Sequence, residues 1–139
     1  METIDTRELD PNFKFEIAEQ EGGEGILKCF ACGSCTARCP EMEVNEDWDP
    51  RVIIRKALLG LKEEVFSSEF IWICSSHYTC LEKCPQGVNI KGVMNQIRNE
   101  RIKEEMLEDL TGVPSKKKMD MDLKYKIVEG ESGKDLYEC

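Results

Sequence analysis

Apolar residues recur at helical spacing in three segments of the chain, and each segment opens with a helix-capping signal. In the first segment Asp10 can cap a helix and Pro11 suits the first helical position. Phe13 and Ile17 then lie one turn apart, which predicts a short helix that the following glycine-rich residues end. Because Phe13, Phe15 and Ile17 also alternate, the same segment permits a strand.

The other two segments have clearer apolar faces. One begins at the cap signal Asp49–Pro50, ends near Gly60, and has apolar residues at Val52, Ile53, Ala57, Leu58 and Leu61. The other begins at the cap Asn89, ends at Gly112 and Pro114, and has apolar residues at Ile90, Val93, Met94, Ile97, Ile102, Met106 and Leu110. Both segments are predicted to be helices, and together the patterns indicate an all-α core.

A shorter segment, SSEFIWIC at 67–74, lies directly before a cysteine-rich stretch. One of its serines can cap it, and Phe70, Ile71 and Ile73 are predicted to be buried. Trp72 is predicted to shield the neighbouring cysteines from water.

The length of 139 residues suits one small domain and is short for a large enzyme with a deep substrate cleft. We expect an N-terminal extension with a short helix at 1–28, a domain at 29–110 and a loose C-terminal tail at 111–139. The tail contains one strand-like run, DLKYKIV, that we expect to pair only on a partner.

The formal net charge of −9 disfavours nucleic acid as a partner, because phosphate-backbone binding needs a basic surface. The longest apolar run, 70–74, is far shorter than the roughly 20 residues of a bilayer span, so we expect no membrane span. The acidic N-terminus lacks the pattern of a secretory signal. We therefore expect a reducing, cytoplasmic location in which thiolates are free to bind metal.

Seven of the eight cysteines and the sole histidine fall in two stretches, CFACGSCTARCP at 29–40 and CSSHYTCLEKCP at 74–85. The first has the spacing C-x2-C-x2-C-x3-C-P, and the second repeats it with His77 at the second ligand position. This spacing is typical of ferredoxins with two clusters, in which the cysteine before the proline ligates the other cluster.

The spacing therefore predicts two iron-sulfur clusters of the 4Fe-4S type with crossed ligation. The first cluster is expected to be held by Cys29, Cys32, Cys35 and Cys84. The second is expected to be held by Cys39, Cys74, Cys80 and whatever position 77 provides. Crossing ties the two loops together, so metal binding should also stabilise the fold.

His77 leaves two alternatives open. It can be a surface residue, with the second cluster left as a 3Fe-4S species or completed by another group. It can instead ligate through a neutral ring nitrogen, which removes negative charge from the cluster and raises its potential, as histidines do in Rieske centres. We predict histidine coordination. Cys139 in the tail is predicted to be a free thiol without function.

Zinc is the alternative metal, because Cys-x2-Cys and Cys-x2-His are both used in zinc sites. Against zinc, four cysteines fall within eleven residues and both stretches end in Cys-Pro. No dinucleotide fingerprint, phosphate loop or Ser-His-Asp set is present in the sequence, so a hydrolytic or nucleotide-binding function is not predicted.

The two cysteine stretches, joined by DPRVIIRKALLG and followed by CPQGVNI, resemble the C subunit of heterodisulfide reductase over roughly residues 9–110. This is the small iron-sulfur subunit of methanogens and related anaerobes. The resemblance implies a helical ferredoxin-like fold with two cluster-binding loops, and it carries over to all seven cysteines of the two stretches. The family has cysteine where His77 stands, so this chain departs from the pattern at the second cluster.

In that family, the small iron-sulfur subunit receives electrons from a larger iron-sulfur partner that bears a flavin. It passes them to a catalytic, cysteine-rich partner, which reduces the mixed disulfide of coenzyme M and coenzyme B. The resemblance implies that this chain is a non-catalytic electron-transfer subunit with those two partners. The alternatives are a stand-alone ferredoxin or iron-sulfur subunit of a related oxidoreductase and, third, a zinc-stabilised interaction module.

Overall fold

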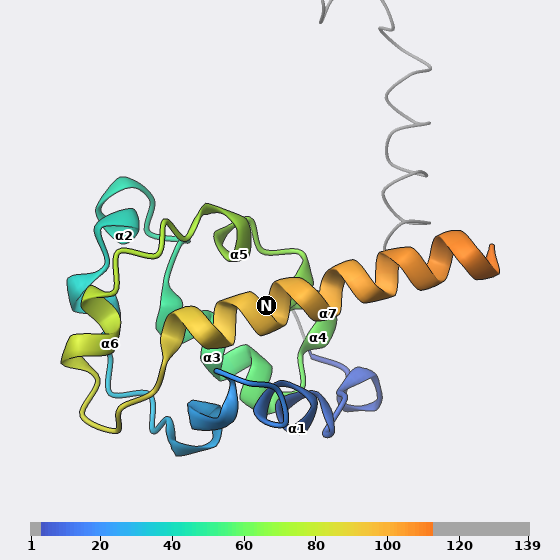
Figure 1. Ribbon diagram of the computed structural model, residues 1–139, viewed down its shortest axis with the longest axis horizontal. Helices are drawn as coiled ribbons and strands as arrows, with labels where there is room; N and C mark the ends of the chain where they lie inside the picture. The colour runs from blue at the N-terminus through green and yellow to red at the C-terminus, as the bar shows by residue number, and fades with distance from the viewer. Residues whose placement is uncertain (1–3, 113–139) are drawn as a thin grey trace, which may run out of the picture. The chain divides into compact units, whose positions relative to one another are not determined.

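The computed structural model describes residues 4–112, and every regular element in this part of the chain is helical (Figure 1). The α-helices are α1 Phe13–Ala18, α2 Pro40–Val44, α3 Pro50–Leu59, α4 Lys62–Phe66, α5 Phe70–Ile73, α6 Thr79–Lys83 and α7 Ile90–Thr111. The predicted all-α class is confirmed. The strand considered for Phe13–Ile17 is wrong, because these residues form α1. The tail segment DLKYKIV and Cys139 lie outside the described residues.

Helix α1 forms in the predicted segment but begins at Phe13, two residues later than a cap at Asp10 with Pro11 at the first helical position would place it; its N-cap residue is Asn12, whose side chain makes no capping hydrogen bond. The carboxylate of Asp10 accepts a hydrogen bond of 2.9 Å from the backbone N–H of Asn12 in the turn that leads into the helix. Phe13 and Ile17 are fully buried, as their one-turn spacing predicts. The ring of Phe13 meets that of Phe66 in α4 edge to face, with 5.4 Å between the ring centroids, so α1 and α4 share one part of the core.

Helix α3 also begins and ends at its predicted signals. The carboxylate of Asp49 accepts from the backbone N–H groups of Arg51 at 2.8 Å and Val52 at 3.4 Å, which is the bonding of an N-cap. Gly60 ends the helix in the left-handed conformation with φ of 81°. A side chain there would place Cβ 2.3 Å from the carbonyl oxygen of Asp10, so this turn also needs glycine for close packing.

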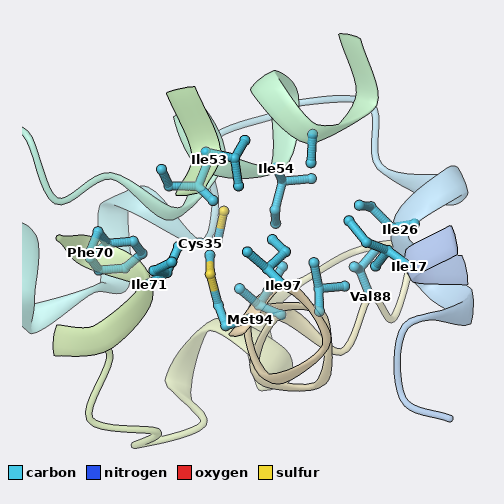
Figure 2. Packing of buried hydrophobic residues seen from close by; sticks show 14 of the residues in the cluster. Ile17, Ile26, Cys35, Ile53, Ile54, Phe70, Ile71, Val88, Met94 and Ile97 are labelled. Atoms are coloured by element: carbon cyan, nitrogen blue, oxygen red, sulfur yellow. The ribbon is translucent and has the colours of Figure 1, made fainter. Parts of the chain in front are cut away.

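The N-terminal half of α7 supplies much of the core. Asn89 caps the helix by accepting a hydrogen bond of 3.0 Å from the backbone N–H of Gly92. The buried residues of this half that pack in the core are Ile90, Val93, Met94 and Ile97. Figure 2 shows Met94 and Ile97 near Ile53 and Ile54 of α3, with Cys35 in the same cluster. The core therefore extends to a cysteine of the first stretch.

Several apolar residues that the sequence assigns to the interior lie on the surface instead. Val52 is 39% exposed, because the neighbouring Ile53 and Ile54 are the residues of this α3 turn that face the core. Phe70 and Ile71 of α5 are buried as predicted, whereas Ile73 is only partly buried. Trp72 is 51% exposed and lines neither of the cavities around the cysteines, so the prediction that it shields them is wrong. The predicted α7 stripe is likewise exposed from Ile102 onward, at Ile102, Met106 and Leu110.

The chain divides into one compact unit at 1–102 and a second at 103–139. All seven cysteines of the two stretches belong to the first unit. The domain bounds expected from the sequence, at 1–28, 29–110 and 111–139, stay a prediction. Among residues 4–112, no helix is long and apolar enough to span a bilayer.

Candidate metal centres

Four cysteines from two distant parts of the sequence line one cavity. They are Cys29, Cys32, Cys35 and Cys84. The first three come from the loop between the 3-10 turns η2 (Glu24–Lys28) and η3 (Thr36–Arg38), whereas Cys84 follows α6. Left-handed backbone at Ala31 (φ 58°) and Gly33 (φ 85°) curls this loop, so the loop encloses a space with sulfur on several sides.

A second cavity is lined by the thiols of Cys39, Cys74 and Cys80 and by the imidazole of His77. Cys39 directly precedes α2, Cys74 follows α5, and Cys80 lies in α6. The loop that contains His77 has left-handed backbone at Ser76 (φ 61°) and Tyr78 (φ 64°). Such conformations cost roughly 1 kcal/mol or more for residues other than glycine, and they persist where the surroundings fix them, often at functional sites.

The fourth cysteine of each stretch lines the cavity of the other stretch. Cys39 belongs to the first stretch and lines the second cavity, whereas Cys84 belongs to the second stretch and lines the first cavity. Contacts between α6 and η3 bring the two stretches side by side. The structure thus brings together each set of side chains that the spacing predicts, and their binding of iron stays a prediction.

The two cavities share a wall. Ile90, the first residue of α7, lines both of them and is only 2% exposed. The two cavities are therefore neighbours at Ile90. Cys80 of the second set also interacts electrostatically with Cys35 of the first, so the two sets of thiols lie close together.

Three of the thiols are buried, and burial raises their pKa because a thiolate loses its hydration there. The pKa of Cys80 is raised to about 11, by burial first and then by the charge of Cys74. The pKa values of Cys35 and Cys39 are also raised, with burial as the main cause. Ionising all of these thiols at neutral pH therefore needs a compensating cation in the cavities, which is what iron supplies when it binds.

Cys32 contrasts with these thiols, because it is exposed. Its pKa is lowered, and the main cause is the hydrogen bond between its sulfur and the Ser34 hydroxyl at 3.4 Å. The sulfur of Cys84 accepts a hydrogen bond of 3.4 Å from the backbone N–H of Val88. Hydrogen bonds to ligand sulfurs and exposure to solvent both change the reduction potential of an iron-sulfur cluster. The first cavity has both features, so both would influence the potential of a cluster bound there.

His77 is held through one ring nitrogen. Its Nδ1 lies 3.0 Å from the hydroxyl oxygen of Thr79, and the backbone N–H of Thr79 donates to the same nitrogen at 3.4 Å. The imidazole is partly buried and lines the cavity together with three thiols. Since Thr79 lies at Nδ1, a metal would bind at Nε2, which requires the tautomer that carries the ring proton on Nδ1.

Each cavity also has one cationic side chain in its lining, Arg51 of α3 in the first and Lys91 of α7 in the second. The ammonium group of Lys91 is hydrogen-bonded to the hydroxyl of Tyr78 and lies 4.6 Å from the centroid of its ring. The sequence did not identify these cations, Thr79 or the shared wall at Ile90. The sequence offered one signal for Ile90 and Lys91: they directly follow the helix cap Asn89, which comes soon after the second cysteine stretch and so places them near its cysteines.

Among the described residues, no three His, Cys, Asp or Glu side chains are gathered closely enough to hold a single metal ion. The cysteines are instead divided between the linings of two separate cavities. Soft thiolates placed around a space of this kind suit an iron-sulfur cluster. The residues present therefore fit two such clusters.

Comparisons with known proteins agree with this chemistry. Residues 24–88 match the family model of a 4Fe-4S dicluster domain. The chain is 40% identical over 95 residues to the C subunit of the H(2):CoB-CoM heterodisulfide,ferredoxin reductase of Methanothermobacter marburgensis, an alignment covering 68% of this chain and 50% of the relative. It is 36% identical over 103 residues to the iron-sulfur C subunit of the CoB-CoM heterodisulfide reductase of Methanopyrus kandleri, covering 69% and 53%.

A helical chain with this domain and two cysteine-lined cavities is an iron-sulfur protein of the two-cluster class, with a role in electron transfer. Within that class, the chain belongs to the family of the heterodisulfide reductase C subunit. It spans about half the length of the curated relatives it matches, 50% and 53% for the two described above.

Proposed function

We propose that the chain is a non-catalytic subunit that relays electrons between two others, an iron-sulfur protein that bears a flavin and a catalytic, cysteine-rich protein. The cysteine-rich protein reduces the heterodisulfide of coenzyme M and coenzyme B. The observation that carries the proposal is the pair of cysteine-lined cavities that share Ile90 as a wall. Adjacent centres suit a relay, since an electron can enter at one and leave from the other. The names of the relatives support the heterodisulfide as the final acceptor.

The ligand sets are part of the proposal. Cys29, Cys32, Cys35 and Cys84 would hold the first cluster, and Cys39, Cys74, Cys80 and the Nε2 atom of His77 would hold the second. Iron-sulfur clusters supply reversible uptake of single electrons when bound. The protein's own part is to keep the two centres apart with Ile90, to exclude water with the surrounding core, and to set the local charge with Arg51 and Lys91.

A reducing location in the cytoplasm belongs to the same proposal, because thiols must stay reduced to take up iron and sulfide. The proposed partners are the flavin-bearing and cysteine-rich subunits of one complex. The support for these partners is the family relationship and the subunit designation in the names of the relatives.

The first test is anaerobic purification followed by metal and sulfide analysis. Two cubanes predict about eight iron and eight acid-labile sulfide per chain, and a second centre of the three-iron type predicts about seven iron. A colourless protein that contains zinc and no sulfide would contradict the proposal and support the zinc-stabilised interaction module.

The second test concerns the partners. The dithionite-reduced protein should be reoxidised by the heterodisulfide when the cysteine-rich subunit is added, and should remain reduced when that subunit is omitted. Native purification should also recover the flavin-bearing and cysteine-rich subunits with the chain. A stable monomer that neither recovers these subunits nor reduces the heterodisulfide through them would indicate a stand-alone ferredoxin.

A further inference from the structure

Thr79 contacts His77 in two chemically different ways, both at the Nδ1 atom. Its hydroxyl oxygen lies 3.0 Å from Nδ1, and its backbone N–H donates to Nδ1 at 3.4 Å. Thr79 is the first residue of α6 and directly precedes Cys80, which lines the same cavity as His77. The residue that engages the imidazole is therefore built into the helix that carries a neighbouring thiol.

The two contacts favour opposite tautomers of a neutral imidazole. A backbone N–H can only donate, so its bond requires Nδ1 to be an acceptor and places the ring proton on Nε2. A hydroxyl can donate or accept, so it can also receive a proton held on Nδ1. The Nε2 lone pair is free for iron only in the second tautomer, which the Thr79 hydroxyl permits and the backbone N–H does not.

We propose that Thr79 is a positioning residue for the second metal centre: with iron bound, its hydroxyl, the shorter contact at 3.0 Å, accepts the Nδ1–H of His77 in place of the 3.4 Å bond from the backbone N–H, and Nε2 is thereby kept unprotonated for iron. This inference rests on the proposed ligation by His77 and adds the group that selects the tautomer. Metal-ligating histidines generally donate their other ring N–H to an oxygen acceptor, and that acceptor orients the ring and raises its basicity.

The local backbone restricts the position of this hydroxyl. Tyr78, between His77 and Thr79, has the left-handed conformation with φ of 64°, and Ser76 on the other side of His77 has φ of 61°. Tyr78 is in turn held by Lys91 of α7 through its hydroxyl and its ring. The backbone on both sides of His77 is therefore restricted, and removing the hydroxyl leaves the backbone N–H of Thr79 as the contact at Nδ1, so the variants should favour the tautomer with the proton on Nε2.

The test compares Thr79→Val and Thr79→Ala, which lack the hydroxyl, with Thr79→Ser, which keeps it. The readout is the nitrogen coupling to the reduced second cluster in pulsed electron paramagnetic resonance. His77 is the sole histidine, so ¹⁵N-histidine labelling of untagged protein reports this ring alone. Wild type and Thr79→Ser should show the strong coupling, and both hydroxyl-free variants should lose most of it.

Loss of such a hydrogen-bond partner typically lowers metal affinity by roughly tenfold or more. The coupled signal should therefore fall to a minor fraction of its wild-type amplitude, while the all-cysteine first cluster keeps its spectrum and shows that the protein is folded. If Thr79→Val fails to assemble the first cluster, Thr79→Ala, which removes the branched side chain as well, answers the same question.

The outcomes separate this inference from the ligation on which it rests. Strong nitrogen coupling in wild type that persists in both hydroxyl-free variants would overturn the role of Thr79 and leave ligation by His77 intact. Absence of nitrogen coupling in wild type would overturn ligation by His77 and the inference with it. Loss of coupling in Thr79→Ser as well would show that the hydroxyl is not the group that matters, and would also overturn the inference.

Discussion

The two cavities are each lined by four candidate ligands, yet the ligands differ in kind. The first is lined by four thiols, one of them the exposed Cys32, whereas the second is lined by three thiols and the imidazole of His77. Each has one cationic residue in its lining. A repeated spacing in the sequence therefore leads to two sites with the same number of candidate ligands and unequal charge.

The difference in charge should set the order of the two potentials. An imidazole in place of a thiolate removes one negative charge at contact with iron, which favours the reduced state of the second cluster. Greater exposure at Cys32 favours the reduced state of the first cluster, so the two effects oppose each other. The ligand charge should dominate, because Coulomb interactions are strongest and least screened at contact distance. The second cluster is thus expected to have the higher potential.

The largest effect should come from removing a crossed ligand. Cys39→Ser should abolish or convert the second cluster and leave the first, whereas Cys84→Ser should do the reverse, because each cysteine lines the cavity of the other stretch. Iron content and the spectra of the two reduced clusters measure this directly. Loss of the first cluster from Cys39→Ser alone would contradict crossed ligation. Cys139→Ser is the matched control and should change neither cluster.

Truncation of the shared wall should affect both sites at once. Ile90→Ala should lower the free energy of unfolding of the holoprotein by about 2–5 kcal/mol, the usual cost of removing a buried isoleucine side chain. It should also make both clusters more sensitive to oxygen, since the residue lines both cavities. Denaturant titration and the rates of bleaching in air measure the two effects. Met94→Ala, a buried change at a residue that lines neither of these cavities, controls for general destabilisation.

His77→Cys should make the two sites alike in charge. Its second cluster should have a potential lower by roughly 100 mV or more, since two histidines raise Rieske centres by a few hundred millivolts over all-cysteine centres. Redox titration followed by electron paramagnetic resonance gives both potentials. An unchanged second potential would show that the ring does not bind iron, and a shift confined to the first potential would contradict the assignment of the sites.

The smallest effect should come from the cations that line the cavities. Lys91→Gln should lower the second potential and Arg51→Gln the first, each on the order of 40 mV, which corresponds to a Coulomb interaction of about 1 kcal/mol with a partly solvated charge. Each variant serves as the control for the other in the same titration. If either variant shifted both potentials equally, each cation would act on both clusters alike, which would contradict the expectation that each acts mainly on the cluster in its own cavity.

The sequence predicts the longer helices of the described fold well, because their caps are encoded by residues with specific hydrogen bonds. Asp49 and Asn89 both cap as expected, and Gly60 ends α3 in the left-handed conformation. Short helices such as α4 and α6 were missed, since Leu61 and Tyr78 at their starts are not capping residues. Pro40 at the start of α2 was an available signal for that helix.

Of the candidate sites, the sequence predicted the grouping of the ligands, because that grouping follows from the spacing of the cysteines. The grouping of Cys39 with Cys74 and Cys80 follows from the motif, and the cavity lining has the same grouping. The contacts of Thr79 and Lys91 could not be predicted, because they depend on how α6 and α7 meet the loop around His77. Trp72 was misjudged for a similar reason: its position in α5 turns it to solvent, while Phe70 lines the second cavity.

The most direct test of two unlike clusters is a redox titration of the wild-type protein labelled with ¹⁵N-histidine. Pulsed electron paramagnetic resonance would be recorded at a potential where only the more easily reduced cluster holds an electron. We predict two separate one-electron steps, with nitrogen coupling in the spectrum of the cluster reduced at the higher potential. Two steps without nitrogen coupling in either spectrum, or coupling in the cluster of lower potential, would contradict the account.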